Sequence, residues 1–337
     1  MNKEAKLSLI ARNSVEILTP GELKSLVEKK KQISAYYGTA PTGPYHLAYL
    51  GPLSKLVDFQ QAGIKTIVLI ADIHAALDDL KTPWEQVEQR SLYYKKCIEL
   101  AVPWKVKPKF ILGSNYQLTD RYALDVLKMS SFTTINRAER AASEVTRMKI
   151  PKVSELIYPI MQSLDEKYLG IDIQVGGLDQ RHIMAFAREY LPKLGYSQHV
   201  EIMTPLIASI KGPGTKMSAS VPESCIKVYE SEDSIRRKIK EAYCPAGELA
   251  DNSIVQICQY IIFPFQRRIK IAREKKFGGD VVFKNFDELK EEFVNKRLHP
   301  LDLKNTVADE LIKLFFKVRK YFEKNQDILK ELGDAFL

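Results

Sequence analysis

Residues 158–180 carry the side chains whose types and spacing could do chemistry. Tyr158, Gln162 and Asp165 follow one another at i, i+4 and i+7, so a helix would place all three on one face. Together with Gln180 they would combine a hydroxyl, two amides and a carboxylate. The same spacing also fits a solvated helix face, and on spacing alone both interpretations stay open.

The surrounding sequence indicates which elements must position these side chains. Gly170 ends the helix, and residues 171–175 alternate between apolar and polar, which predicts a half-buried strand. Gly176 and Gly177 then allow a close approach of the backbone, and Asp179 follows at the start of the next helix. Ligands of open α/β sheets bind beyond the carboxyl ends of strands, so this segment is a candidate binding site.

Strand-like and helix-like segments alternate through the first two thirds of the chain. Residues 82–85 resemble a capping box, with proline at the first helical position of a helix that reaches about residue 101. The alternation with short loops predicts a doubly wound, mostly parallel α/β sheet. The expected strands are residues 33–38, 64–75 and 109–113, and the other expected helices are residues 20–31, 46–63 and 119–131.

Two further loops could contact phosphate groups. Residues 39–45 connect a strand to a helix, and free backbone N–H groups at such a junction form an anion site. Residues 209–224 contain Gly212, Gly214 and Lys216, which predicts a mobile surface loop able to close over phosphates. An ordinary linker would have a similar composition, so neither loop is specific by itself.

Composition describes an ordinary soluble protein without a membrane span. The chain has 337 residues, 45% of them hydrophobic and 28% charged, which is enough for a substantial core and two domains. The N-terminus lacks the apolar segment of a signal peptide, so we expect a cytoplasmic protein with no membrane partner. The cysteines are scattered without a C-x-x-C pair, which suggests neither a disulfide framework nor a metal site.

The charge distribution points to a polyanionic partner. The formal net charge is +9, and residues 266–276 carry six basic side chains against one acid. Residues 231–337 are rich in helices and charges, and apolar residues from Leu303 to Val318 keep a period of three to four. This C-terminal part therefore reads as a separate helical domain.

Several motifs in one order resemble a known family. Tyr36, the segment PTGPYHLAY and the later KMSAS resemble the two signature motifs of class I aminoacyl-tRNA synthetases. YPIMQSLDEKYLGIDIQVGGLDQ is similar to the amino-acid site of tyrosyl-tRNA synthetases in their archaeal and eukaryotic form. The similarity covers nearly the whole chain, including ADIHA, EAYCPAG, KFGGD and HPLDLKN.

The resemblance implies a fold and a reaction. The expected fold is a Rossmann-like catalytic domain in residues 1–224, followed by a helical anticodon-binding domain in residues 225–337. The expected activity is that of a tyrosine–tRNA ligase. L-tyrosine and ATP would form tyrosyl-adenylate and pyrophosphate, and tyrosine would then pass to the 3′-terminal adenosine of tRNA(Tyr). The family also implies a homodimer.

The resemblance assigns a tyrosine pocket. Tyr158 and Gln162 would hold the ammonium group, and Tyr36 and Asp165 would bond the phenolic hydroxyl. A buried carboxylate facing this hydroxyl is satisfied by tyrosine and left unpaired by phenylalanine. Tyr116 would help to form the pocket wall. The complete predicted pocket is Tyr36, Tyr158, Gln162, Asp165, Gln180, Leu69, His74 and Gln117.

The resemblance also assigns the catalytic and ATP-binding residues. His46 and Lys216 match the first histidine of the HIGH motif and the first lysine of the KMSKS motif. Magnesium would accompany ATP, and no histidine–carboxylate spacing suggests a further metal. Tyr49 replaces the second histidine. Ala219 removes one phosphate donor of the motif, a loss expected to slow activation by up to ~10²-fold. The predicted ATP-binding residues are Thr42, Gly43, His46, Tyr49, Gly176, Gly177, Asp179, Lys216, Met217, Ser218 and Ser220.

The predicted tRNA contacts lie in two segments. Phe277 would stack on a splayed anticodon base while Asp302 reads guanine, with His299 nearby, because single-stranded loops are read by stacking and edge contacts. Arg137 and Arg140 would approach the acceptor end, although a solvated helix face explains these arginines equally well.

Three other functions compete with this interpretation. Tryptophanyl-tRNA synthetases share fold and motifs, but recognition of an indole N–H would not require the pairing of Tyr36 with Asp165. A non-catalytic RNA-binding paralogue is suggested only by KMSAS, and His46, Lys216 and the tyrosine pocket argue against it. A nucleotidylyltransferase of similar fold leaves the C-terminal helices and HPLDLKN unexplained.

Overall fold

The computed structural model describes residues 1–146, 152–214 and 216–337. Within these residues the chain divides into two units. Unit 1 consists of residues 1–43, 58–95 and 106–205, and unit 2 of residues 44–57, 96–105 and 206–337. Helices α3 (Leu50–Gln61) and α5 (Val87–Ala101) contribute residues to both units. The domain boundary expected between residues 224 and 225 stays a prediction.

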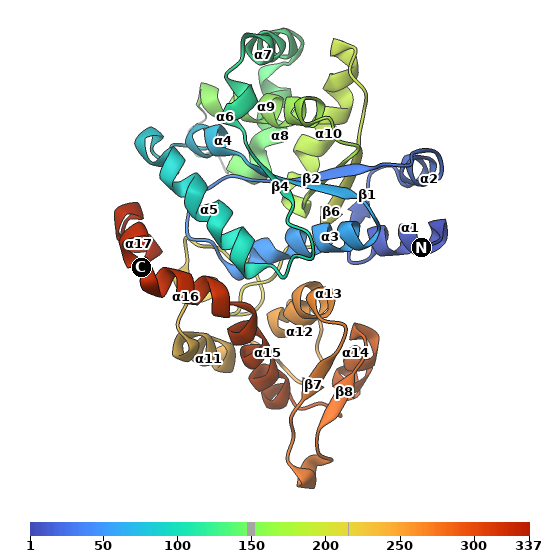
Figure 1. The fold of residues 1–337 in the computed structure, drawn as a ribbon, viewed down its shortest axis with the longest axis vertical. Coiled ribbons are helices and arrows are strands. Elements are labelled where there is room, and N and C mark those ends of the chain that lie inside the picture. Colours follow the sequence, from blue (N-terminus) through green and yellow to red (C-terminus); the bar gives the residue numbers. More distant parts are fainter. Residues whose placement is uncertain (147–151, 215) are drawn as a thin grey trace. The chain divides into compact units, whose positions relative to one another are not determined.

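Unit 1 is built on one sheet with the strand order β1-β6-β5-β2-β3-β4 (Figure 1). Neighbouring strands are parallel except for β1 and β6, which confirms the predicted mostly parallel α/β sheet. The strands are β1 (Glu16–Ile17), β2 (Ser34–Thr39), β3 (Lys65–Ile70), β4 (Lys109–Leu112), β5 (Ile173–Gly177) and β6 (Val200–Thr204).

The strand order reverses between β2 and β5. From β2 the chain proceeds to β3 and β4 on one side, while β5 and β6 lie on the other side. At such a reversal the connections leave the sheet in opposite directions, and a crevice opens beyond the carboxyl ends of the two strands. The segments that follow β2 and β5 are residues 40–43 and 178–180, both of which the sequence analysis singled out.

Helix α9 lies at the centre of the helices of unit 1. It packs against α4, α7, α8 and α10, and Figure 1 shows α7 to α10 together on one side of the sheet. It ends because Gly170 adopts a φ of 62°, a conformation that glycine reaches without strain. The helices are α1 (Lys3–Ala11), α2 (Pro20–Lys29), α4 (Asp72–Leu77), α6 (Ser114–Gln117), α7 (Asp120–Phe132), α8 (Ile135–Thr146), α9 (Val153–Leu169) and α10 (Arg181–Tyr190).

Two predictions about where elements of unit 1 begin and end were wrong. The strand expected over residues 64–75 ends at Ile70, because Asp72 starts α4 and its Oδ1 accepts the backbone N–H groups of Ile73 (3.0 Å) and Ser114 (2.9 Å). The capping box at residues 82–85 does not form. The Thr82 hydroxyl donates instead to the Pro41 carbonyl oxygen (2.7 Å), and a 3-10 turn over residues 84–86 leads into α5.

Unit 2 is mainly helical, as expected for its C-terminal part, but it also contains a short hairpin of β7 (Ile269–Ile271) and β8 (Val281–Phe283). Part of the basic run at residues 266–276 is therefore a strand that buries Ile269 and Ile271 and exposes Lys270. Helix α15 packs against α11, α12, α16 and β7. The helices are α11 (Glu232–Glu241), α12 (Ser253–Ile257), α13 (Phe263–Phe265), α14 (Phe286–Val294), α15 (Pro300–Leu314), α16 (Phe316–Lys324) and α17 (Gln326–Leu332).

The apolar stripe predicted from Leu303 to Val318 spans two helices. Leu303, Val307 and Leu311 are fully buried on α15, and Val318 is buried on α16. Across the described ranges of the chain, we find no helix long and apolar enough to cross a membrane.

Candidate amino-acid site

The structure places every residue of the predicted amino-acid pocket in unit 1. The residues come from segments far apart in the sequence, and hydrogen bonds and ring contacts link most of them. They are Tyr36 on β2, Leu69 on β3, His74 on α4, Gln117 on α6, Tyr158, Gln162 and Asp165 on α9, and Gln180 directly before α10.

Asp165 is a buried carboxylate whose two oxygens have different surroundings. Its Oδ1 accepts hydrogen bonds from Gln117 Nε2 and from the Tyr122 hydroxyl, both at 2.8 Å. Its Oδ2 has no hydrogen-bond partner in the described part of the chain, although the residue is only 1% exposed. A buried acceptor without a donor is costly, so this oxygen is suited to a donor that a ligand brings.

Burial sets the protonation of this region. It raises the pKa of Asp165 to about 7, against the opposing effect of its polar neighbours Gln117, Tyr116 and Tyr122. Burial lowers the pKa of His74 to about 4, so this imidazole is neutral at pH 7. His74 Nε2 lies 3.9 Å from Asp165 Oδ2, and the contact is therefore not an ion pair at neutral pH. The His74 ring also meets the Tyr158 ring edge-on, with centroids 4.7 Å apart.

The other polar residues of the pocket meet at Gln174. Gln162 Nε2 donates to Gln180 Oε1 (3.1 Å) and to the side-chain oxygen of Gln174 (3.1 Å), which also accepts from the Tyr36 hydroxyl (3.0 Å). Gln174 is 3% exposed, so β5 is buried on both faces and the prediction of a half-buried strand was wrong.

Sequence reasoning missed Gln174 and Tyr122 as members of this site. Strands inside parallel sheets are covered on both faces, so a polar residue within one was a usable signal for Gln174. No sequence signal identified Tyr122, which lies 43 residues before the carboxylate that it contacts.

The close approach predicted at Gly176 is confirmed, and the neighbours are side chains. A Cβ on Gly176 would lie 2.8 Å from Met184 Cε and 2.9 Å from Gln180 Cγ. Glycine at this position therefore leaves room for the side chain of Gln180.

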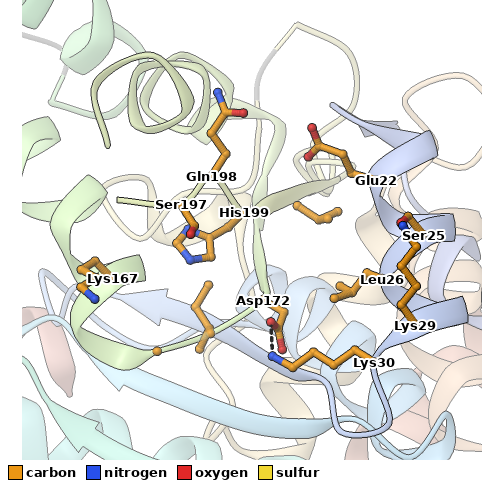
Figure 2. Close-up of a pocket in the computed structure, with 13 residues that line it drawn as sticks. Glu22, Ser25, Leu26, Lys29, Lys30, Lys167, Asp172, Ser197, Gln198 and His199 are labelled. Carbon is orange, nitrogen blue, oxygen red and sulfur yellow. Dashed lines mark hydrogen bonds and ion pairs between the residues drawn. The ribbon is translucent and has the colours of Figure 1, made fainter. Parts of the chain in front are cut away.

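A pocket of about 620 Å³ lies at the opposite ends of the strands. Figure 2 shows that its lining includes Lys30 and Asp172, which form an ion pair at the start of β5, and His199, just before β6. None of the predicted site residues lines this pocket, which flanks the amino ends of β5 and β6.

Comparison with known proteins identifies the family. A family model described as tRNA synthetases class I (W and Y) matches residues 28–316. The chain belongs to this family of class I tRNA synthetases. As a member of the family it takes ATP as a substrate.

Individual relatives agree with this assignment. A tyrosine–tRNA ligase of Archaeoglobus fulgidus is 46% identical over 95% of this chain and 98% of the relative. A crystal structure of tyrosyl-tRNA synthetase from the same organism, complexed with L-tyrosine, has a TM-score of 0.90 at 45% identity and covers 95% of this chain and 99% of that one. A cytoplasmic tyrosine–tRNA ligase of Danio rerio is 39% identical over 99% of this chain, which spans 63% of that relative.

The two residues that the synthetase motifs mark as catalytic both lie in unit 2. His46 is 5% exposed, and burial together with the charge of Lys216 lowers its pKa to about 3. The imidazole is therefore neutral at pH 7 and can act as a hydrogen-bonding group without charge. Its ring lies 4.5 Å from that of Tyr49, and its Nδ1 makes no hydrogen bond within the described residues.

The KMSAS segment has defined backbone contacts directly after Lys216. Met217 N donates to the Ile207 carbonyl oxygen (3.1 Å), and Ser218 N donates to Ser224 Oγ (3.2 Å). The hydroxyls of Ser218 and Ser220 are 2.8 Å apart. Residue 215, within the loop predicted to be mobile, lies outside the described residues.

The ATP-binding residues predicted in unit 1 follow β2 and β5. Thr42 N donates to the Ala40 carbonyl oxygen (2.9 Å), and Gly43 N donates to the Tyr94 hydroxyl (3.3 Å). These two backbone groups already have partners, so the expectation of free N–H groups at this loop was wrong for them. Gly177 ends β5, and Asp179 lies in the 3-10 turn that follows it.

The predicted tRNA contacts have mixed surroundings. Arg137 Nε donates to Glu189 (2.9 Å), whereas Arg140 is exposed on α8. His299 caps α15 by accepting the N–H of Leu301 at Nδ1 (3.1 Å), and Asp302 lies half-buried in the first turn of that helix. The side chain of Phe277 lies outside the described residues.

Proposed function

We propose that this chain is a tyrosine–tRNA ligase, which activates L-tyrosine with ATP and transfers it to the 3′-terminal adenosine of tRNA(Tyr). The observation that carries the proposal is the buried Asp165, whose Oδ2 has no hydrogen-bond partner among the residues that the structure describes. A phenolic hydroxyl supplies that donor, and neither phenylalanine nor an aliphatic amino acid does. The tyrosine–tRNA ligases among the relatives support the same activity.

In this proposal the amino acid lies between β2 and α9. Asp165 and Tyr36 bond its phenolic hydroxyl, and Tyr158 and Gln162 hold its ammonium group, with Gln180 beside Gln162. Its carboxylate then attacks the α-phosphate of ATP, and pyrophosphate leaves. Positioning of the carboxylate and stabilisation of the phosphate charge supply most of the rate enhancement in such a transfer.

The ATP contacts are proposed for each unit separately. In unit 1 the backbone at Gly43, Gly176 and Gly177 and the carboxylate of Asp179 would contact the nucleotide. In unit 2 the neutral His46 would donate a hydrogen bond, and Lys216 would supply positive charge to the phosphates. Thr42, Tyr49, Met217, Ser218 and Ser220 complete the predicted set, and magnesium would enter with the phosphates.

We propose tRNA contacts for Arg140, Phe277, His299 and Asp302. We propose a tRNA contact for Arg137 as well. This side chain already pairs with Glu189, so its substitution would also disturb the packing of α8 and α10. We further propose that the protein is a cytoplasmic homodimer. The vertebrate relative carries the word cytoplasmic in its name.

The decisive experiment is amino-acid-dependent exchange of pyrophosphate into ATP, measured with each of the twenty amino acids. We expect exchange with tyrosine alone, and its loss or relaxed specificity in Asp165→Ala. Exchange with tryptophan would assign the chain to the other branch of its family. Absence of exchange with every amino acid, in a folded protein that still binds tRNA, would favour the non-catalytic RNA-binding function.

A further inference from the structure

Gln174 makes every hydrogen bond that an amide can make. Its nitrogen donates to Glu166 Oε1 (2.6 Å) and Glu201 Oε2 (3.2 Å), and its oxygen accepts from Tyr36 and Gln162. Two donors and two acceptor sites are thereby used. In the reversed orientation the amide oxygen would face the two glutamate oxygens and the amide nitrogen would face the donors of Tyr36 and Gln162, so the hydrogen bonds form in this orientation.

The sheet register explains why these groups meet. Gln174 on β5 is paired with Tyr36 on β2 and with Glu201 on β6, so the three side chains lie side by side on one face of parallel strands. Glu166 reaches the same place from α9 and is held by His199 Nδ1 (2.9 Å). Both glutamates are fully buried.

The two glutamates fix the direction of the amide. Burial raises the pKa of both, and the charge of Glu166 raises that of Glu201 further. The pair presents two carboxyl oxygens, Glu166 Oε1 and Glu201 Oε2, to Gln174. The amide nitrogen must face them, and the amide oxygen must face the tyrosine pocket.

The orientation of the Gln174 amide determines which atoms of Tyr36 and Gln162 remain available to a ligand. The single proton of the Tyr36 hydroxyl is used by Gln174, which leaves lone pairs of that oxygen for a ligand. Both N–H groups of Gln162 are used by Gln174 and Gln180, which leaves Gln162 Oε1 as an acceptor. Asp165 Oδ2 is a third acceptor without a donor within the described chain.

We propose that Gln174 is a positioning residue that turns the acceptor lone pairs of Tyr36 and Gln162 toward the amino-acid pocket, and so favours a ligand that brings a donor hydroxyl at one end and an ammonium group at the other. The inference rests on the proposed function, because it assumes that tyrosine occupies this pocket. It adds a residue that acts on the ligand through Tyr36 and Gln162.

The first test uses Gln174→Leu, which keeps the volume and removes the amide. The freed Tyr36 and Gln162 can then turn donors toward the ligand, and two buried donors lose an acceptor. We expect the KM for tyrosine in pyrophosphate exchange to rise roughly 10- to 100-fold, with the KM for ATP unchanged. Ser163→Ala is the control, because it removes a buried hydrogen bond of α9 to Pro159 that does not reach the pocket.

The second test measures ligand polarity in the unmodified protein. The ligands are 4-amino-L-phenylalanine, which keeps a donor at the ring, and 4-fluoro-L-phenylalanine, which has none. A pocket that turns the acceptors of Asp165 and Tyr36 toward the ring substituent binds the amino compound at least 10-fold more tightly, as competition with tyrosine would show. In Gln174→Leu we expect a smaller difference in affinity between the two ligands. Gln174→Met replaces the leucine variant in this test if that variant does not fold.

Equal binding of the two ligands by the unmodified protein overturns the inference, whatever the variants do. The inference is also overturned if a folded leucine or methionine variant has the same KM for tyrosine as the unmodified protein. A variant whose exchange rate falls while the KM values for tyrosine and for ATP stay the same would overturn it too. Failure of the proposed function looks different, because the unmodified protein would then show no exchange with tyrosine at all.

Discussion

Asp165 has the surroundings of a group that binds a ligand rather than one that stabilises the fold. Gln117 and Tyr122 satisfy one oxygen, and the other faces the neutral His74 at 3.9 Å. Burial destabilises the ionised form of this carboxyl group, and its pKa therefore rises to about 7. A phenolic hydroxyl that donates to the carboxylate replaces the hydrogen bond from water that this oxygen loses on burial.

This environment makes tyrosine binding depend on pH. The ionised carboxylate is the form that accepts the phenolic proton, and the raised pKa means that protonation competes with the ligand below about pH 7. We expect the KM for tyrosine to increase about tenfold per pH unit below that value and to level off above it. His74 and His46 do not interfere, because their pKa values lie near 4 and 3.

Measurement of the KM for tyrosine by pyrophosphate exchange between pH 5.5 and 8.5 checks this dependence. In Asp165→Asn the group cannot titrate, so its KM should be high and should not change across this range. A flat profile in the unmodified protein, or the same slope in the asparagine variant, would show that another group controls binding.

At the scale of elements, the junction of β4 and α6 positions Gln117. Gly113 stands at this junction, and a Cβ there would lie 2.5 Å from Gln117 Oε1 and 2.9 Å from Asp72 Oδ1. Its φ is −58°, so any residue could adopt the backbone conformation and only the contact demands glycine. The junction therefore allows Gln117 to reach Asp165.

We expect Gly113→Ala to displace Gln117 and to raise the KM for tyrosine by roughly tenfold, the effect of one weakened hydrogen bond to a buried charge. The KM for ATP should stay unchanged. Gly21→Ala is a matched control, because a Cβ at Gly21 meets nothing within 4 Å. An unchanged KM for tyrosine in a folded Gly113→Ala protein would mean that Gln117 does not support the pocket.

The KMSAS segment differs from the KMSKS motif at Ala219, and the effect of this difference can be tested. Ala219 is half-buried in a segment that the backbone contacts of Met217 and Ser218 hold in place. A lysine at this position would add a cationic donor for the phosphates. We expect Ala219→Lys to increase the rate of activation by up to ~10²-fold, measured as pyrophosphate exchange at saturating tyrosine and ATP.

A methionine at the same position separates charge from bulk. Ala219→Met adds a side chain of comparable length without a donor, so it should leave the rate unchanged or lower it. Equal rates in the lysine variant and the unmodified protein would indicate that Lys216 and the backbone already supply the needed stabilisation.

At the scale of the whole molecule, exposed apolar side chains gather on neighbouring elements of unit 1. Leu118 is 72% exposed at the end of α6, Leu127 is 68% exposed on α7, and Ile135 is 69% exposed at the start of α8. Leu124 and Phe132 on α7 are at least half exposed. Large exposed apolar surface is unusual on a monomer, so these residues are candidates for the interface of the proposed homodimer.

We therefore expect a dimer at micromolar concentration, with twice the chain mass in light scattering coupled to gel filtration. Leu127→Asp should shift the protein toward the monomer without unfolding it, because the side chain is exposed within its own chain. Leu92→Asp is the control, since Leu92 is also exposed (57%) but lies on α5. A protein that is monomeric, or a dimer that Leu127→Asp leaves intact, would place any interface elsewhere.

The sequence by itself determined the features that depend on local order. Helical periodicity put Tyr158, Gln162 and Asp165 on one face, because spacing along a helix defines direction whatever surrounds it. Alternating segments predicted the parallel sheet, and the motifs around His46 and Lys216 indicated the family. The start of α4 and the absence of a cap at Thr82 escaped prediction, since contacts with Ser114 and Pro41 from other segments decide them.

Only the tertiary structure decided what surrounds the pocket. Tyr122 and Gln117 reach Asp165 across more than 40 residues, and Gln174 meets its partners through the register of β2, β5 and β6. Burial and the raised pKa of Asp165 follow from these neighbours and not from its position in the sequence. The physical reason is that desolvation and hydrogen-bond partners depend on which segments cover a residue, and one strand's sequence does not record what packs on either face.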